Sequence, residues 1–293
     1  MTPDQRRCHA LAAAGLPDAA FARVHSYSNE VWVGEQVVVR VAHLGLIGGE
    51  LGRLPREAAI AAQLPREARY PEIVAVGRDD AQAWMITRRV PGVQLARAWP
   101  ALAAAERERA TRELAAALAA VHATPCDGIP DDIRPPHTLA LAPLLELCAE
   151  TFPEAHEYVQ AHWGAFDDAD RGLVHGDPHL ENVLWHDGHI SALLDFEWSR
   201  PSWIHCDLEI LLAVAGDPKP FVAADLEALV DRAQFADVPR WLRAECPQWF
   251  AHPRLAERLT VLEISRLLGA IADDPKSAVE LGPKLRALIE SAP

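Results

Sequence analysis

The sequence predicts an α+β protein with a small N-terminal lobe, built on an antiparallel β-sheet with a helix, and a larger C-terminal lobe that is mainly helical. Residues 30–42, EVWVGEQVVVRVA, contain two β-branched runs around a short turn, which is typical of a β-hairpin. The Pro-Gly pair at 91–92 marks a turn, and from residues 101–123 onward apolar residues recur at helical spacing. We therefore expect an N-lobe over residues 1–89 and a C-lobe over residues 90–293, with a ligand cleft between them.

The elements of the N-lobe follow one another along the chain. After the hairpin, LPREAAIAAQL over residues 54–64 is predicted to be a helix, because Pro55 suits its first turn. EIVAVGR (72–78) and AWMITRRV (83–90) are predicted to form two further strands.

The C-lobe is predicted to begin with a long amphipathic helix over residues 101–123, followed by a loop rich in proline and aspartate. A second helical stretch is expected over residues 140–163. The short strands VLW and ISALLDF then flank Asp187-Gly188, a strong hairpin signal. Residues 205–290 are predicted to be helical, with interruptions at GDPKP and ECPQ.

Composition and charge narrow the classes of function. The net charge is −14, from 28 Lys and Arg against 42 Asp and Glu, which argues against a nucleic-acid partner and favours a cationic small molecule. No apolar run approaches the roughly 18–20 residues of a membrane-spanning helix, so no membrane partner is expected. The N-terminal stretch MTPDQRRCHALAAAGLPDAA fits an amphipathic helix better than a signal peptide, so we expect a cytoplasmic protein, and a monomer. The five cysteines include no C-x-x-C pair, which predicts reduced thiols.

The segment HGDPHLEN, followed by DFE, carries the residues most indicative of chemistry. Asp177 and Asn182 lie on one loop, where Pro178 disfavours a helical conformation for Asp177. The predicted hairpin begins after Asn182 and ends at Asp195, so these two side chains should lie side by side. Asn and Asp supply hard oxygen ligands for Mg²⁺, and a further carboxylate can accept the proton of an attacking hydroxyl. This arrangement suits phosphoryl transfer.

Two other interpretations of this segment stay open. Asp177-Pro178-His179 is the Asp-x-His fragment that begins some two-metal phosphohydrolase clusters, although no Gly-Asn-His follows it. His175 and His179 could also ligate a metal together, but Pro178 opposes a helix between them, and no third ligand has a matching spacing.

The segments LVHGDPHLENVLW and ISALLDFEWSRPSWIHCDLEILL together resemble the aminoglycoside phosphotransferase family of small-molecule kinases, over roughly residues 20–270. The resemblance implies a protein-kinase-like fold, with Asp177 as catalytic base and with Asn182 and Asp195 holding magnesium, two ions in all. It also implies ATP or GTP as the phosphoryl donor. By the same resemblance His175 orients the catalytic loop, and Asp207 braces that loop from the following helix.

The nucleotide site is expected in the N-lobe. Arg40 is the only cation in the strand VVVRVA, and Glu57 on the next helix is its natural partner. The family usually has lysine at this position, so a nucleotide-binding pseudokinase or regulator stays open as an alternative. Further candidate nucleotide contacts come from the loop that replaces a Gly-rich loop and from the strand and linker over the adenine: Ser26, Ser28, Asn29, Met85, Ile86 and Arg88.

The acceptor is expected to be a small molecule, because the chain has no long activation segment after DFE and Glu197 replaces the glycine of DFG. A cationic antibiotic, either an aminoglycoside or a basic peptide, would make the protein a resistance enzyme. A neutral or amine-bearing metabolite and a macrolide are the alternatives. The candidate acceptor-binding residues are Glu197, Trp198, Trp203 and Glu263.

Overall fold

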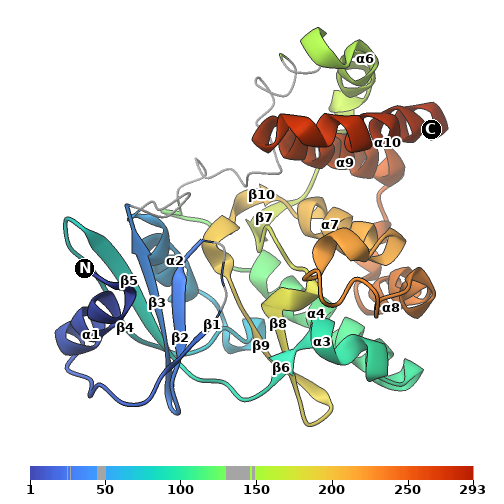
Figure 1. Ribbon diagram of the computed structural model, residues 1–293. Coiled ribbons are helices and arrows are strands. Elements are labelled where there is room, and N and C mark those ends of the chain that lie inside the picture. Colours follow the sequence, from blue (N-terminus) through green and yellow to red (C-terminus); the bar gives the residue numbers. More distant parts are fainter. Residues whose placement is uncertain (25, 27, 45–50, 130–145, 147–148, 293) are drawn as a thin grey trace.

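The computed structural model describes residues 1–24, 26, 28–44, 51–129, 146 and 149–292. An antiparallel sheet occupies one side of the molecule and helices dominate the other, which confirms the predicted α+β class (Figure 1). The strand that ends at Arg88 is the last one along the chain that belongs to the N-terminal sheet. The next strand along the chain pairs with the β-hairpin of the C-terminal region. The chain therefore leaves the N-terminal sheet after β5 (Gln82–Arg88).

The N-terminal sheet is antiparallel throughout, in the order β1-β2-β3-β5-β4. Its strands are β1 (Ala22–Val24), β2 (Glu30–Val33), β3 (Val37–His43), β4 (Ile73–Arg78) and β5 (Gln82–Arg88). Helix α1 (Pro3–Ala13) packs on one face, where Val39 and Val41 of β3 are buried. Helix α2 (Arg53–Ala61) packs on the other face, where Ala42 of β3 lies against Met85. Because side chains alternate along a strand, Arg40 points to the α2 face.

Two small sheets frame the predicted catalytic segment. β6 (Val93–Gln94), β8 (Val183–His186) and β9 (His189–Leu193) form one sheet, and β7 (Arg171–Val174) pairs with β10 (Arg200–Trp203) in the other. Asp187 and Gly188 both have positive φ, 48° and 80°, as the tight turn of the β8–β9 hairpin requires. The hairpin prediction is therefore confirmed.

The helices of the C-terminal region are α3 (Leu95–Ala98), α4 (Ala104–His122), α6 (Pro153–His162), α7 (His205–Gly216), α8 (Val238–Glu245), α9 (Leu255–Asp273) and α10 (Ala278–Ser291). Helices α6, α9 and α10 pack together around their own apolar cluster, at a distance from the N-terminal sheet (Figure 1). Helices α4, α7 and α8 surround the larger core beneath the hairpin. Among the described residues, none of the helices combines the length and the apolar character needed to cross a bilayer.

One helix prediction needs correction. The helical run predicted over 205–290 is broken for longer than expected, because the chain between α7 and α8 forms only short 3-10 helices and turns. The helix predicted over 140–163 lies partly outside the described residues, at 140–145 and 147–148, and its described part is helical over α6, as predicted. The described cysteines are all free thiols, as expected.

Candidate active site

The loop that follows β7 is held by a buried carboxylate, Asp207, in the first turn of α7. Its Oδ2 accepts hydrogen bonds from the backbone N–H of His175 and from Nε2 of His122, both at 2.9 Å, and its Oδ1 accepts the N–H of Gly176 at 2.8 Å. Burial acts to raise the pKa of Asp207, but the hydrogen bond and charge of His122 outweigh it, and the pKa lies below its usual value. An ionised carboxylate with three donors therefore anchors the loop, at the place where bracing was predicted.

The side chain of His175 joins this loop to the segment that contains Asp195. Its Nε2 lies 2.9 Å from the carbonyl oxygen of Leu194, and its Nδ1 accepts the N–H of Asp177 at 3.2 Å. The two contacts fit a neutral ring protonated at Nε2, a tautomer assigned from the hydrogen bonds. The ring also packs against Phe196, with centroids 4.4 Å apart. His175 thus connects the loop that carries Asp177 to the segment that carries Asp195.

Asn182 lies where the β8–β9 hairpin begins, opposite the residue that precedes Asp195. Its carbonyl accepts the N–H of Leu194 at 2.7 Å, which closes this end of the hairpin. Its side-chain Nδ2 donates to the carbonyl of Asp177 at 2.9 Å and lies 3.3 Å from Oδ2 of the same residue. With the amide nitrogen turned toward Asp177, the amide oxygen is the atom that can ligate a cation.

Asp195 has a left-handed backbone conformation, with φ of 65°. This region is costly for a residue other than glycine, although aspartate and asparagine tolerate it best. Its Oδ1 accepts a hydrogen bond from Nη2 of Arg40 at 2.9 Å, across 155 residues of sequence. The carboxylate and Asn182 form an oxygen donor set of the kind Mg²⁺ prefers, so the residues present fit a magnesium site. No group of three or more His, Cys, Asp or Glu residues suited to a metal occurs in the described part of the chain.

Arg40 and Glu57 form the ion pair that the sequence indicated. Nη1 of Arg40 donates to Oε1 of Glu57 at 2.7 Å, and the glutamate side chain is fully buried. The same oxygen accepts the hydroxyl of Tyr70 at 3.0 Å and the N–H of Phe196 at 3.2 Å. Burial raises the pKa of Glu57 against the opposing charge of Arg40. Burial acts to lower the pKa of Arg40, but the charges of Glu57 and Asp195 outweigh it and hold that pKa well above its usual value. The guanidinium is therefore permanently charged and shared between α2 and Asp195.

Tyr70 is a site residue that the sequence did not reveal. Its hydroxyl also lies 3.6 Å from the sulfur of Met85, and its ring meets Phe196 edge-on at 5.3 Å. A tyrosine before a predicted strand carries no motif, so only the three-dimensional contact identifies it. The sequence indicates His179 only as a candidate metal ligand. In the structure its Nε2 instead lies 3.2 Å from Oδ2 of Asp177.

Glu197 is nearly fully buried beside Asp195, with 5% of its surface exposed. Burial and the negative charge of Asp195 raise its pKa to about 7, although a hydrogen bond from Ser28 partly opposes them. Its Oε2 has no hydrogen-bond partner among the described residues. Ser28, from the turn between β1 and β2, also accepts a hydrogen bond from Nδ2 of Asn29 at 3.0 Å. The predicted nucleotide loop therefore touches the segment that follows Asp195.

The remaining predicted nucleotide residues lie on the loop before β2 or on β5. Ser26 is exposed, whereas Met85 is fully buried on the α2 face. Ile86 is paired on both sides within the sheet, and the N–H of Arg88 donates to the carbonyl of Glu72 at 2.8 Å. These backbone groups are thus already engaged within the fold.

The predicted acceptor residues fall into two groups. Trp198 is close to Asp195 in the chain, and the guanidinium of Arg53 on α2 lies 4.4 Å from its ring centroid. Trp203 instead packs at 4.5 Å against Phe166, toward the α6, α9 and α10 helices. Glu263 lies 3.5 Å from Arg266 on α9, so it belongs to an ion-pair network between α7 and α9. Within the described part of the chain, Trp198 thus lies against α2 near Asp195, whereas Trp203 and Glu263 lie among the C-terminal helices.

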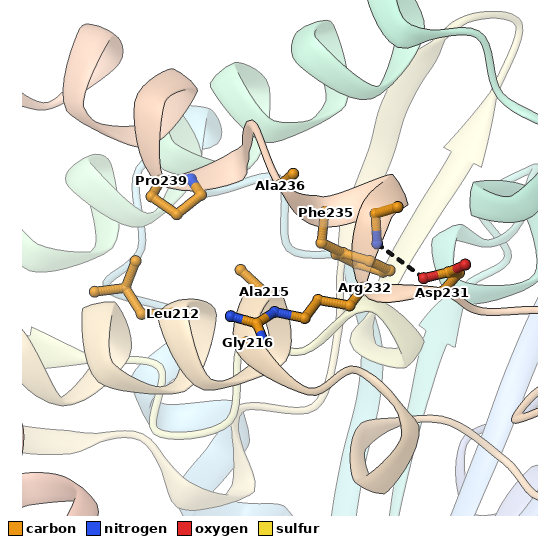
Figure 2. Close-up of a pocket in the computed structure, with 9 residues that line it drawn as sticks. Leu212, Ala215, Gly216, Asp231, Arg232, Phe235, Ala236 and Pro239 are labelled. Carbon is orange, nitrogen blue, oxygen red and sulfur yellow. Dashed lines mark hydrogen bonds between the residues drawn. The ribbon is translucent and has the colours of Figure 1, made fainter.

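A pocket of about 620 Å³ lies between the end of α7 and the chain leading into α8 (Figure 2). Arg232 reaches across its opening, and the carboxylate of Asp231 accepts the N–H of Ala233 at 2.9 Å. None of the predicted site residues lines this pocket. Its walls are formed by Leu212, Ala215, Gly216, Asp231, Arg232, Ala233, Phe235, Ala236 and Pro239.

Comparisons with known proteins bear on the family and the fold of the chain. The model of the phosphotransferase enzyme family matches residues 21–244. The fold is similar to that of aminoglycoside phosphotransferase APH(4)-Ia, with a TM-score of 0.67, 16% identity and 99% of each chain covered. It is also similar to aminoglycoside 2'-phosphotransferase-IIIa in its GDP complex, with a TM-score of 0.65, 17% identity and 99% of each chain covered.

Two further similar proteins have names that indicate other acceptors. Amicoumacin kinase hAmiN, in complex with AMP-PNP, Ca²⁺ and Ami, has a TM-score of 0.60 and 13% identity, over 99% of this chain and 95% of that one. A homoserine kinase of Gluconobacter oxydans (strain 621H) is 33% identical over 84 residues. That match spans 25% of this chain and 27% of the homoserine kinase.

Proposed function

The chain belongs to the phosphotransferase enzyme family, and we propose that it transfers the γ-phosphoryl group of ATP or GTP to a hydroxyl group of a small molecule. The observation that carries this proposal is the convergence of Asp177, Asn182 and Asp195 on one loop and one hairpin. Their backbones are held together by His175 and by the bonds between Asn182 and Leu194. Such an arrangement catalyses mainly by positioning and by electrostatic stabilisation.

Each residue then has a distinct role. Asp177 orients the acceptor hydroxyl and takes its proton. Asn182 and Asp195 would hold magnesium, which supplies positive charge beside the transferring phosphoryl group. Arg40, held by Glu57 through Nη1, is proposed to meet the phosphates of the nucleotide with the side of the guanidinium that contacts Asp195 in this structure. Ser28 and Asn29 are proposed as further phosphate contacts, and Met85, Ile86 and Arg88 on β5 as contacts of the base.

For the acceptor, we propose a cationic antibiotic such as an aminoglycoside or a basic peptide, which would make the protein a resistance enzyme. The net charge of −14 supports attraction of a cation. The buried carboxyl of Glu197 lies close enough to Asp195 for the two charges to interact, and its Oε2 has no hydrogen-bond partner in the described part of the chain, so we propose it as a contact for a cationic group. Solved structures with the same fold include an enzyme in complex with hygromycin B.

The local similarity to a homoserine kinase favours a second candidate acceptor, an amine-bearing metabolite with a hydroxyl group. Both candidates carry an ammonium group, so charge does not separate them. Separation requires a direct comparison of acceptors.

The test is a panel of hydroxylated antibiotics, amino alcohols and neutral sugars, screened for ADP or GDP release with Mg²⁺ present. We expect release with at least one acceptor. Asp177→Asn should abolish that release while nucleotide binding is retained. Asp187→Asn is the matched control, because Asp187 lies at the turn of the hairpin that follows the Asp177 loop, its side chain is 88% exposed, and asparagine accepts its positive φ.

Retained turnover in Asp177→Asn would overturn the assignment of the base. Nucleotide binding without release for any acceptor would favour the pseudokinase or regulator. Hydrolysis of phosphate esters without nucleotide would favour the phosphohydrolase.

A further inference from the structure

We propose that His179 is a positioning residue that holds the carboxylate of Asp177 in the orientation needed to accept the hydroxyl proton. This inference rests on the proposed function of Asp177 as the base. Nε2 of His179 lies 3.2 Å from Oδ2 of Asp177, and the two side chains are 18% and 24% exposed. A carboxylate without such a contact could rotate about its last bond, because that torsion has only a shallow preference.

The local sequence explains why the two side chains meet. Pro178 between them disfavours a helical conformation for Asp177, and His179 itself is extended, with φ of −79° and ψ of 167°. In extended backbone, residues two apart point to the same side. The imidazole of His179 can therefore turn back toward the carboxylate of Asp177.

The proton on His179 is placed by a second contact. Nδ1 accepts the backbone N–H of Glu181 at 3.3 Å, which caps the short 3-10 helix Leu180–Asn182. Because Nδ1 is an acceptor, the proton must lie on Nε2, and that nitrogen donates to Asp177. The donor is present whether the ring is neutral or charged, so the role does not depend on titration of the ring.

A second donor acts on the same oxygen. Nδ2 of Asn182 lies 3.3 Å from Oδ2 of Asp177 and 3.4 Å from Nε2 of His179. The amide nitrogen of Asn182 has two hydrogens, and the shorter of its contacts, at 2.9 Å, is with the carbonyl of Asp177. Its contact with Oδ2 is slightly longer than that of His179, so we assign to His179 the shorter of these two contacts to that oxygen.

Two amide variants separate this role from the capping role of the same side chain. In His179→Gln, the amide nitrogen can replace Nε2 and donate to Asp177, but the acceptor for Glu181 is lost. In His179→Asn, the amide oxygen can replace Nδ1 and accept from Glu181, but the donor to Asp177 is lost. The variants thus remove one contact each and serve as controls for one another.

We expect His179→Asn to lower kcat about 10- to 100-fold, the factor that follows from losing a hydrogen bond to a charged group, with the nucleotide KM changed by less than about threefold. His179→Gln should keep kcat within about threefold and should show the larger decrease in Tm. Turnover is measured with the best acceptor of the panel or, with water as acceptor, as nucleotide hydrolysis.

The opposite order of kcat values, or equal kcat values in the two variants, would overturn the proposal, because a purely structural role predicts that loss of the cap is the more harmful change. Asp177→Asn is measured alongside. If that variant keeps turnover, the proposed base itself fails. If it loses turnover while His179→Asn keeps it, only the positioning role fails.

Discussion

The buried ion pair between Arg40 and Glu57 allows a quantitative test of how the N-terminal sheet is tied to the catalytic segment. The side chain of Glu57 has no exposed surface, and that of Arg40 is 14% exposed. In Arg40→Met, the buried carboxylate of Glu57 loses the guanidinium with which it is paired. We expect a loss of about 3–5 kcal/mol in the free energy of unfolding, the usual cost of leaving one member of a buried pair without its partner.

The partner variant should cost less. In Glu57→Gln, the amide oxygen can still accept the Tyr70 hydroxyl and the Phe196 N–H, and Arg40 keeps its contact with Asp195. We expect a loss of about 1–3 kcal/mol. The double variant carries neither buried charge and should be more stable than the sum of the two losses predicts, by about 2 kcal/mol or more.

Urea unfolding of the four proteins, followed by tryptophan fluorescence and far-UV circular dichroism, measures these free energies if both probes give one coincident transition. The reasoning fails if Arg40→Met costs less than about 1 kcal/mol. It also fails if the two losses add within about 0.5 kcal/mol, because additivity is the mark of independent sites.

Three further predictions concern the surroundings of the site. Gly176 has φ of 88°, and a Cβ at this position would lie 2.6 Å from the backbone oxygen of Trp198. Gly176→Ala should therefore lower Tm by several degrees and abolish turnover. An unchanged Tm in thermal unfolding would contradict the close approach of the two backbones. Tyr70→Phe removes one hydrogen-bond donor to Glu57. It should lower the free energy of unfolding in urea by about 1–2 kcal/mol and raise the nucleotide KM severalfold. Wild-type values of both quantities would show that the hydroxyl is dispensable. Burial raises the pKa of Glu209 to about 7 despite Arg266, so the folded protein holds a proton there that the unfolded chain releases above its ordinary pKa of about 4.5. Stability should therefore decrease by up to about 3 kcal/mol as pH rises from 4.5 to 7, and Glu209→Gln should remove this dependence; parallel pH profiles of urea unfolding would refute it.

Local patterns in the sequence were sufficient where chemistry and turn geometry depend on neighbouring residues. The Asp187-Gly188 turn fixes the hairpin, and the hairpin places Asn182 beside the segment of Asp195. The contact between Arg40 and Glu57 also follows from strand alternation and the next helix. These parts of the fold and of the candidate site were predictable for that reason.

Contacts between distant segments were not predictable in this way. His122 reaches Asp207 across 85 residues, and no local pattern identifies a histidine at the end of a long helix as a brace for a loop. Tyr70 is missed for the same reason. Between α7 and α8, apolar residues Leu226 and Val230 have helical spacing, yet they enter the larger core from isolated turns. Because both side chains are buried, they reproduce the apolar spacing of a helix although the backbone there is not helical. This spacing explains why a helix was wrongly predicted between α7 and α8.

The contact between Arg40 and Asp195 implies that the protein supplies its own counter-ion at the place proposed for magnesium. A divalent cation that binds Asp195 must share the carboxylate with a guanidinium or displace it toward the phosphates. Asp195 would hold the metal beside a guanidinium whose two terminal nitrogens contact different carboxylates, Nη1 with Glu57 and Nη2 with Asp195. Lysine would have to meet both carboxylates through a single nitrogen, so the two residues would not share the charge in the same geometry.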